Sequence, residues 1–283
     1  MKKVLFLFLT VVVVVSASAQ SLNVMTFNIR LNTSSDGENA WPYRKNKAIS
    51  QILFYNVQIL GVQEALHDQM MDLKEWLTNF SYVGVGRDDG KTAGEYSAIF
   101  YDSTRLKLLK TQTFWLSEQP TVPGSKSWDA AITRIVTWAE FKDRKTKKKF
   151  FVFNTHFDHI GKTARAESAK IILQKVKEIA GKHPVIVTGD FNSTPSDLPY
   201  QIITDANNPH RLTDSKTVCL TPHYGPTGTF NAFKDKETSN EPIDYIFVKG
   251  KVRVLRHGTI SESWQGRFSS DHFPVFATLD LRK

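Results

Sequence analysis

The chain has 283 residues, 41% of them hydrophobic, and a formal net charge of +9. This length fits one domain and permits two, and the charge attracts the chain to polyanions such as nucleic acid or anionic lipid headgroups without choosing between them. A single cysteine excludes an intramolecular disulfide.

The N-terminus has the pattern of a cleaved secretory signal. Lys2 and Lys3 precede an apolar run over residues 4–15, and small residues follow it at Ala17 and Ala19. The run is too short for an ordinary transmembrane helix. We therefore predict a signal peptide at residues 1–19 and a catalytic domain at 20–283, exported to the periplasm or outside the cell without a stable membrane anchor. The alternative is an uncleaved anchor helix.

Short apolar runs, rich in β-branched and aromatic residues, alternate with amphipathic stretches along the rest of the chain. The runs predict buried strands at 23–29, 59–63, 98–101, 135–141, 150–154, 185–188, 243–248 and 273–279. The amphipathic stretches predict helices at 42–55, 69–77 and 164–180. The first helix begins near Pro42 and places Ile49, Ile52 and Leu53 on one face, and the last stops at Gly181. The pattern indicates a layered α/β domain.

The sequence contains no low-complexity linker or tandem repeat that would separate two domains. Two loop-rich stretches, 116–129 and 209–238, are interpreted as insertions over a site. The lysine-rich segment 142–149 lies between two predicted strands. We interpret it as a solvated hairpin turn, in preference to a polyanion-binding patch.

The segment VIVTGDFN is an apolar strand that leads directly into Asp190, Phe191 and Asn192. Alternation along an extended backbone points Asp190 and Asn192 the same way, while Phe191 faces the opposite side. A carboxylate beside a carboxamide can hold and partly deprotonate a water, or complete the oxygen shell of a cation. The alternative is that both side chains only make local turn hydrogen bonds.

The segments PIDYIFV and SSDHFPV place Asp244, Asp271 and His272 at the starts of two further strands. A carboxylate that accepts the second N–H of an imidazole fixes its tautomer and raises its basicity. Asp244 paired with His272 would therefore hold a histidine ready for proton transfer or phosphate contact.

Four other strand-like runs carry polar residues at their ends. Asn28 lies in VMTFNIR, Glu64 in LGVQE, Glu95 in GEYSAIFY and His156 in FNTHFDH. Carboxylates, carboxamides and imidazoles delivered by separate strand ends suit one converged site for a hard divalent cation and a phosphate ester.

The ordered motifs, from TFNIR to SSDHFPV, resemble those of the endonuclease/exonuclease/phosphatase superfamily, and the chain looks like an exported bacterial member. The resemblance covers nearly the whole mature chain. It implies a DNase I-like, four-layer α/β sandwich, in which two mixed β-sheets pack face to face with helices outside. It also implies hydrolysis of a phosphoester with Mg²⁺, or Mn²⁺, as cofactor.

The resemblance implies roles for the matching residues. Those implied at the metal centre are Glu64, as direct ligand, with Asn28, Asp190 and Asp271. Those implied in catalysis are His156, Asp190, Asn192, Asp244, His272 and Glu95. Those implied in phosphate binding are Arg134, Asn192 and His156. Glu95 would pair with His156, as Asp244 with His272. Whether Asp190 or His272 is the general base stays open.

The sequence says less about the substrate, because members of the superfamily act on many phosphoesters. The resemblance leans towards a phosphodiesterase that acts on nucleic acid or nucleotides. A sphingomyelinase-like lipid phosphodiesterase and an inositol phosphate phosphatase are alternatives in the same fold. An exported, non-catalytic binding protein is an alternative of another class. The chain is expected to be a monomer.

Several side chains have two readings. Arg134 is either a phosphate ligand or a surface charge at a strand edge. Trp41 and Phe230 could stack on a substrate ring, but we favour loop anchors that bury apolar area. Asp158 and His159 are secondary candidates, because alternation lets only part of this cluster face the site.

Overall fold

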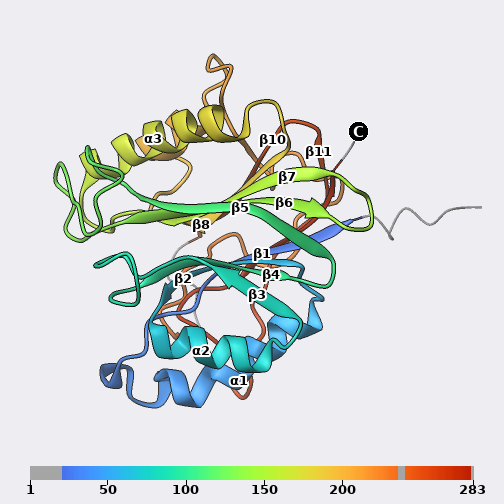
Figure 1. Cartoon of the computed structure of the whole chain (residues 1–283). Coiled ribbons are helices and arrows are strands. Elements are labelled where there is room, and N and C mark those ends of the chain that lie inside the picture. Colours follow the sequence, from blue (N-terminus) through green and yellow to red (C-terminus); the bar gives the residue numbers. More distant parts are fainter. Residues whose placement is uncertain (1–20, 235–239, 282–283) are drawn as a thin grey trace, which may run out of the picture.

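The computed structural model describes residues 21–234 and 240–281 as four stacked layers (Figure 1). Two six-stranded sheets form the inner layers, and helices cover the outer face of each. The prediction of a four-layer α/β sandwich is confirmed. The predicted signal peptide at 1–19 lies outside the described residues. No helix in the described part of the chain combines the length and apolar character needed to span a membrane.

The first sheet has the strand order β11-β12-β1-β2-β4-β3. Its strands are β1 (Leu22–Asn28), β2 (Ile59–Ala65), β3 (Phe80–Val83), β4 (Tyr96–Asp102), β11 (Val252–Thr259) and β12 (Val275–Leu281). β1 and β2 are parallel, and the other neighbours are antiparallel. The C-terminal ends of β1 and β2 and the segment entering β12 therefore meet at one end of the sheet.

The second sheet has the order β5-β6-β7-β8-β10-β9. Its strands are β5 (Leu106–Trp115), β6 (Ile135–Asp143), β7 (Lys149–His156), β8 (Val185–Asp190), β9 (Thr213–Asp214) and β10 (Asp244–Lys249). β7 and β8 are parallel, with His156 opposite Asp190, and β10 is antiparallel to β8, with Asp244 opposite Asp190. This register places the three side chains at one end of the sheet.

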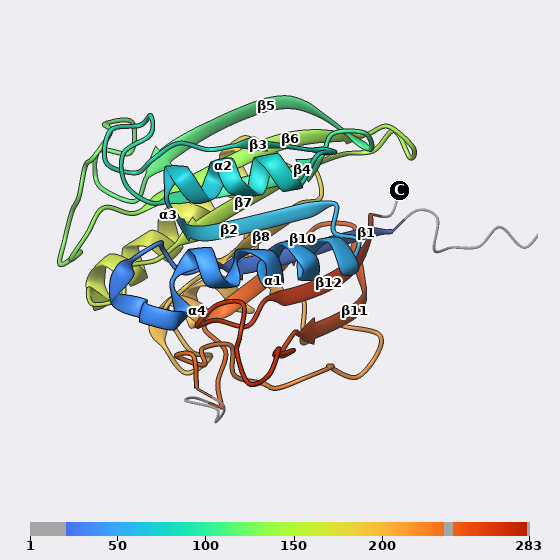
Figure 2. The same cartoon turned by 90° about the horizontal axis from the view of Figure 1, so that it is seen from below.

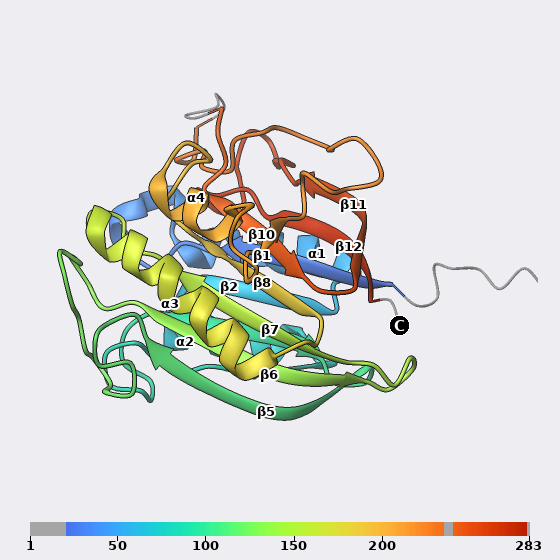
Figure 3. The ribbon, with the colours of Figure 1, turned by 90° about the horizontal axis from the view of Figure 1, so that it is seen from above.

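Helices cover both outer faces. The helices α1 (Trp41–Phe54) and α2 (His67–Trp76) cover the first sheet (Figure 2), and α3 (Lys162–Ala180) and α4 (Leu198–Thr204) cover the second (Figure 3). A 3-10 segment, η2 (Ser34–Asn39), precedes α1. α1 begins with Pro42 in its first turn, and α3 ends at Gly181, whose φ of 55° favours glycine.

Three apolar clusters hold the layers together: one between the sheets and one under each helical layer. The central cluster pairs Ile59 and Ile99 of the first sheet with Val152 and Ile186 of the second. These strands are buried on both faces, which explains their nearly continuous apolar sequences.

Every predicted strand and helix is present, with ends shifted by a few residues. The prediction missed β3, β5, β9 and β11, which are the outer strands of the two sheets, and the short helix α4. Leu53 was wrongly placed on the buried face of α1: it is 53% exposed, whereas Ile49 and Ile52 are buried. The predicted hairpin is confirmed, because β6 and β7 pair with Lys142 opposite Lys149.

Candidate active site

The polar strand ends of both sheets meet around a cavity of about 390 Å³. Its lining comprises Arg30, Leu31, Glu64, Glu95, Ile132, Arg134, His156, His159, Asp190, Asn192, Phe230, Asp271 and His272. Two larger hollows, of about 870 and 550 Å³, contain none of the predicted site residues. The first sheet and its loops supply Glu64, Asp271 and His272, and the second supplies His156, Asp190 and Asn192.

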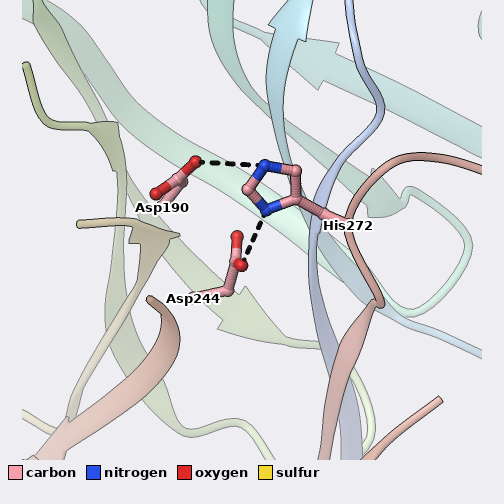
Figure 4. A group of neighbouring side chains, drawn as sticks. All are labelled: Asp190, Asp244 and His272. Carbon is pink, nitrogen blue, oxygen red and sulfur yellow. Dashed lines mark hydrogen bonds and ion pairs between the residues drawn. The ribbon is translucent and has the colours of Figure 1, made fainter. Parts of the chain in front are cut away.

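Asp244, His272 and Asp190 form a buried row (Figure 4). His272 Nδ1 lies 2.9 Å from Asp244 Oδ2, and His272 Nε2 lies 3.8 Å from Asp190 Oδ2. Burial alone would lower the pKa of His272, but the carboxylates of Asp244, Asp190 and Asp271 outweigh it and hold the pKa well above its usual value. The raised pKa favours the imidazolium form of His272, whose Nε2 faces Asp190.

Asp190 is the hub of the polar cluster. Its Oδ2 accepts a hydrogen bond from Asn28 Nδ2 at 3.0 Å and lies 3.4 Å from His156 Nε2, while its Oδ1 accepts from the Asn192 backbone N–H. Burial, followed by the nearby Asp244, raises the pKa of Asp190 to about 7. A carboxyl group with that pKa can take up or release a proton near neutrality.

Asn192 and His156 lie next to each other on the side of the second sheet. Asn192 Nδ2 lies 3.0 Å from His156 Nε2 and donates to the Phe157 carbonyl. Burial, and then the nearby Arg134, lowers the pKa of His156 well below its usual value, so its ring is neutral. As alternation predicts, Phe191 points away from the cavity into the apolar cluster under α3.

The predicted pairing of Glu95 with His156 is wrong. Glu95 instead makes an ion pair with Arg87, with Arg87 Nη1 2.7 Å from Glu95 Oε2. His156 Nδ1 has no partner among the described residues, and the nearest carboxylate to the His156 ring is Asp190. Glu95 still lines the cavity, and burial raises its pKa against the opposing charge of Arg87. The partner of Glu95 is therefore Arg87, a loop residue eight positions earlier in the chain, and not His156.

Glu64 and Asp271 bring carboxylates to the opposite side of the cavity. Arg30 lies 3.8 Å from a carboxylate oxygen of each. Asn28 Nδ2 donates to Glu64 Oε1 at 3.0 Å, while its Oδ1 accepts from the Arg30 backbone N–H. Asn28 thus turns its nitrogen, not its oxygen, toward Glu64 and Asp190. Burial, with a contribution from Glu64, raises the pKa of Asp271.

Glu64 has an unusual backbone. Its φ is 63°, in the left-handed region that residues with a Cβ rarely adopt. The register of β2 against β4 shifts between Val62 and Ala65, which marks a β-bulge. Bulges next to active sites commonly redirect a side chain, and this one presents Glu64 to the cavity.

Arg134 is not a surface charge: it is 4% exposed and lines the cavity. Its Nη2 lies 3.1 Å from His159 Nδ1, and its Nε lies 3.7 Å from Asp158 Oδ2. Its Nε and Nη1 make no hydrogen bond within the described parts of the chain. Asp158 accepts hydrogen bonds from the backbone N–H groups of Ala131, Ile132, Ile160 and Gly161. These bonds outweigh the effect of burial and lower the pKa of Asp158 to about 2. Asp158 thus holds together the loops that contain these four residues.

The two aromatic candidates differ. Trp41 is 1% exposed and donates its indole N–H to Asp72, so the interpretation as an anchor is confirmed. Phe230 lines the cavity, with its ring edge-on to His272 at 5.0 Å. Arg30 also lines the cavity, although the sequence motifs assigned it no role. It lies two residues beyond the end of β1 with a φ of 54°, so strand alternation could not place it, and its only sequence signal was its position in VMTFNIR.

Comparisons with known proteins identify the family and the fold. The sequence model of the Endonuclease/Exonuclease/phosphatase family matches residues 25–272. An endonuclease/exonuclease/phosphatase structure from Bacteroides vulgatus has a TM-score of 0.89 and 41% identity, over 93% of this chain and 99% of that one. A mannosyl-6-phosphatase from Bacteroides thetaiotaomicron has a TM-score of 0.85 and 38% identity, over 91% and 99%.

A more distant relative is the 3'-5'-exoribonuclease subunit Ccr4 of Saccharomyces cerevisiae, which is 22% identical over 86% of this chain. The matched region is 36% of the yeast protein. The chain spans about half the length, or less, of most other curated relatives that it matches.

Proposed function

This chain belongs to the endonuclease/exonuclease/phosphatase family, whose members are hydrolases acting on phosphoester bonds, and on that premise we propose that it is a divalent-metal-dependent phosphatase of small phosphate monoesters. The observation that carries the proposal is a buried cluster of proton-transfer groups beside a carboxylate pair, in one cavity of about 390 Å³. Such a cavity lies within the size range of small-molecule sites.

Glu64 and Asp271 would hold the cation. Both carboxylates lie close to the single charge of Arg30, and Glu64 contributes to the raised pKa of Asp271, so a divalent cation between them would relieve their repulsion. An all-oxygen donor set suits Mg²⁺, with Mn²⁺ as the alternative. A bound cation supplies Lewis-acid stabilisation of phosphoryl oxygens.

Asp190, Asp244 and His272 offer a second set of donor atoms, all within 4.8 Å of one another. His272 Nδ1 and Asp244 Oδ2 already share a hydrogen bond, which a metal ion would have to replace. We therefore assign this group to proton transfer. Asn28 then orients Glu64 and Asp190 through its two hydrogen bonds instead of binding the cation itself.

Asp190 is our choice of general base. With a pKa of about 7, it can take a proton from the attacking water, whose oxygen forms the new bond to phosphorus as the bond to the leaving oxygen breaks. That oxygen leaves as an alkoxide and takes up a proton from solvent to give the alcohol. The His272 imidazolium, held by Asp244, donates from Nε2 to the developing negative charge on the phosphoryl group. Asn192 Nδ2 would be a second donor on the same side once substrate replaces His156 Nε2 as the partner of one N–H, while the Phe157 carbonyl holds the other.

Two observations support a phosphate monoester as substrate. The buried guanidinium of Arg134, whose Nε and Nη1 nitrogens make no hydrogen bond in the described structure, suits the extra charge of a terminal phosphate. The mannosyl-6-phosphatase is 38% identical over nearly its full length. We propose a sugar phosphate or a similar small alcohol phosphate.

Nucleic acid is the second candidate, favoured by the Ccr4 relative and by the position of Phe230 in the cavity lining, where it could stack on a base. The formal charge of +9 is compatible with a polyanionic substrate.

We also propose, from the sequence of residues 1–19, that the protein is exported. N-terminal sequencing of the mature protein would test that proposal.

The experiment is product release from a substrate panel by the purified protein, with Mg²⁺ and with chelator, beside His272→Ala. The panel comprises mannose 6-phosphate, other hexose phosphates, a mononucleotide, poly(A) RNA, duplex DNA, sphingomyelin and an inositol polyphosphate. Chelator-sensitive phosphate release from hexose phosphates, lost in His272→Ala, is the expected result. Cleavage of RNA or DNA alone would transfer the assignment to a nuclease. Binding without cleavage of any member would favour a non-catalytic binding protein.

A further inference from the structure

A buried polar network connects the two sheets directly beneath the cavity. Its centre is Asn154 on β7, which is fully buried. Asn154 Nδ2 donates to the carbonyls of Val62 on β2 and Ala98 on β4, at 2.8 and 2.9 Å. Its Oδ1 accepts from Gln63 Nε2 at 2.7 Å and from Thr188 Oγ1 at 2.9 Å. All the hydrogen-bonding groups of this side chain are thus used, three of its four bonds crossing to the first sheet.

The two carbonyls that Asn154 binds lie at the bulge of β2. Val62 and Ala98 are the last regular pair before the register of β2 and β4 shifts, and Gln63 and Glu64 occupy the shifted segment. A bulge leaves backbone groups unpaired, and a buried unpaired carbonyl is unfavourable. The Asn154 amide gives both of these buried carbonyls a side-chain donor at the point where the ladder becomes irregular.

We infer that Asn154 is a positioning residue: it fixes the bulge that directs Glu64 into the cavity. Side chains alternate along a strand, so a β2 that returned to regular pairing would turn Glu64 away from its present direction. The left-handed φ of Glu64 marks a conformation that the surroundings must maintain. The inference rests on the proposed function only in that Glu64 is taken as a metal ligand.

The network also fixes the two sheets relative to each other. Thr188, which binds Asn154, lies two residues before Asp190 on β8. Gly61 leaves the room that this packing needs, because a Cβ at that position would collide with Thr188 and Asn154. Asn154 thereby connects the strand that carries Glu64 to the strand that carries Asp190.

The test is Mn²⁺ affinity, measured by titration calorimetry on the wild type, Asn154→Leu and Thr155→Val. Leucine has the shape of asparagine without its donors. Thr155 is the adjacent buried residue, and its hydroxyl binds the Ile135 carbonyl within the second sheet, so valine removes one buried hydrogen bond without touching the bulge. Both variants should lower the melting temperature. We expect Asn154→Leu to weaken Mn²⁺ binding at least about tenfold, because loss of a group that orients a metal ligand has an effect of this size. Thr155→Val should change Mn²⁺ affinity less than about twofold.

Asn154→Ser, which keeps one hydroxyl donor, serves if the leucine variant does not fold, and should weaken binding by an intermediate factor. Equal Mn²⁺ affinity in the wild type and the folded Asn154 variants would overturn the inference, since Asn154 would then only join the sheets. A wild type that binds no Mn²⁺ would overturn the metal site and the inference together. A wild type that binds Mn²⁺ but hydrolyses nothing would refute the proposed function alone.

Discussion

The carboxylates and arginines on the two sides of the cavity differ in how far they are withdrawn from solvent. On the side of the first sheet, the side chains of Glu64, Asp271 and Arg30 are 14%, 12% and 29% exposed. On the side of the second sheet, those of Asp190 and Arg134 are 2% and 4% exposed. Acidic groups occur on both sides, so the two sides differ in burial and not in the sign of their charges.

This difference matches the two tasks that we assign to the cavity. A cation must enter and leave, so its ligands need contact with water. A general base needs a pKa near neutrality, and a carboxyl group reaches that value by losing water. Asp190 lies on the more buried side, and its pKa of about 7, for which burial is the largest cause, agrees with this role.

Replacing Asp190 should have the largest effect. Asp190→Asn keeps the shape but cannot accept a proton, and we expect kcat to fall by about 10³-fold. The matched control is Asp214→Asn, which alters another buried carboxyl with a raised pKa, on β9 and outside the cavity. Steady-state phosphate release should be nearly unchanged in that control. Comparable losses in both variants would mean that stability, not base catalysis, explains the result.

The two arginines at the cavity offer a second way to compare its sides. We expect Arg134→Met to raise KM for a phosphate monoester by about 10- to 100-fold, because a buried guanidinium binds an anion with little competition from water. Arg30→Met removes a more exposed cation, which already pairs with Asp36, and should raise KM by less than about fivefold. Initial rates over a range of substrate concentrations would measure both, and a larger effect at Arg30 would contradict the comparison.

The pH dependence of turnover should report Asp190. The reactive form is the deprotonated carboxylate, so kcat should fall about tenfold for each pH unit below its pKa. That pKa is about 7 without metal, and a nearby cation will lower it. Rates between pH 5 and 9 should therefore show an acidic limb at or below about pH 7. A limb that persists unchanged in Asp190→Asn would assign the titration to another group.

Glu95 should matter least among the cavity residues. Glu95→Gln breaks its ion pair with Arg87 but removes no group that contacts His156, so we expect kcat/KM to change by less than about tenfold. A loss comparable with that of Asp190→Asn would restore the catalytic role that the sequence motif suggested. Phosphate release by the two variants, purified in parallel, distinguishes these outcomes.

The fold was predictable wherever burial leaves a continuous apolar signal. The eight strands found from sequence are the inner strands of the two sheets, and the four missed strands are their edges. An edge strand such as β5 exposes Lys107 and Lys110 to solvent, so its sequence resembles a polar loop. The same reasoning failed at Leu53, which is 53% exposed although it follows Ile49 at helical spacing.

The site was predictable to the level of residue type at strand ends, but not to the level of partners. Asp244 and His272 could be paired from sequence because each begins a strand that converges on one end of the sandwich. Glu95 could not, since its partner Arg87 lies in an adjacent loop of no regular pattern. The bulge at Glu64 was also invisible, because it depends on Asn154 from the other sheet.

The most direct test of the division between the two sides is a Mg²⁺ titration of turnover in the wild type, Glu64→Gln and Asp190→Asn. We predict that Glu64→Gln needs at least about tenfold more Mg²⁺ but recovers to within about tenfold of wild-type kcat at saturation, because a weakened metal site can be refilled. Asp190→Asn should stay about 10³-fold below the wild type at every Mg²⁺ concentration. Recovery of Asp190→Asn by added Mg²⁺, or a Glu64→Gln variant that metal cannot rescue, would contradict the account.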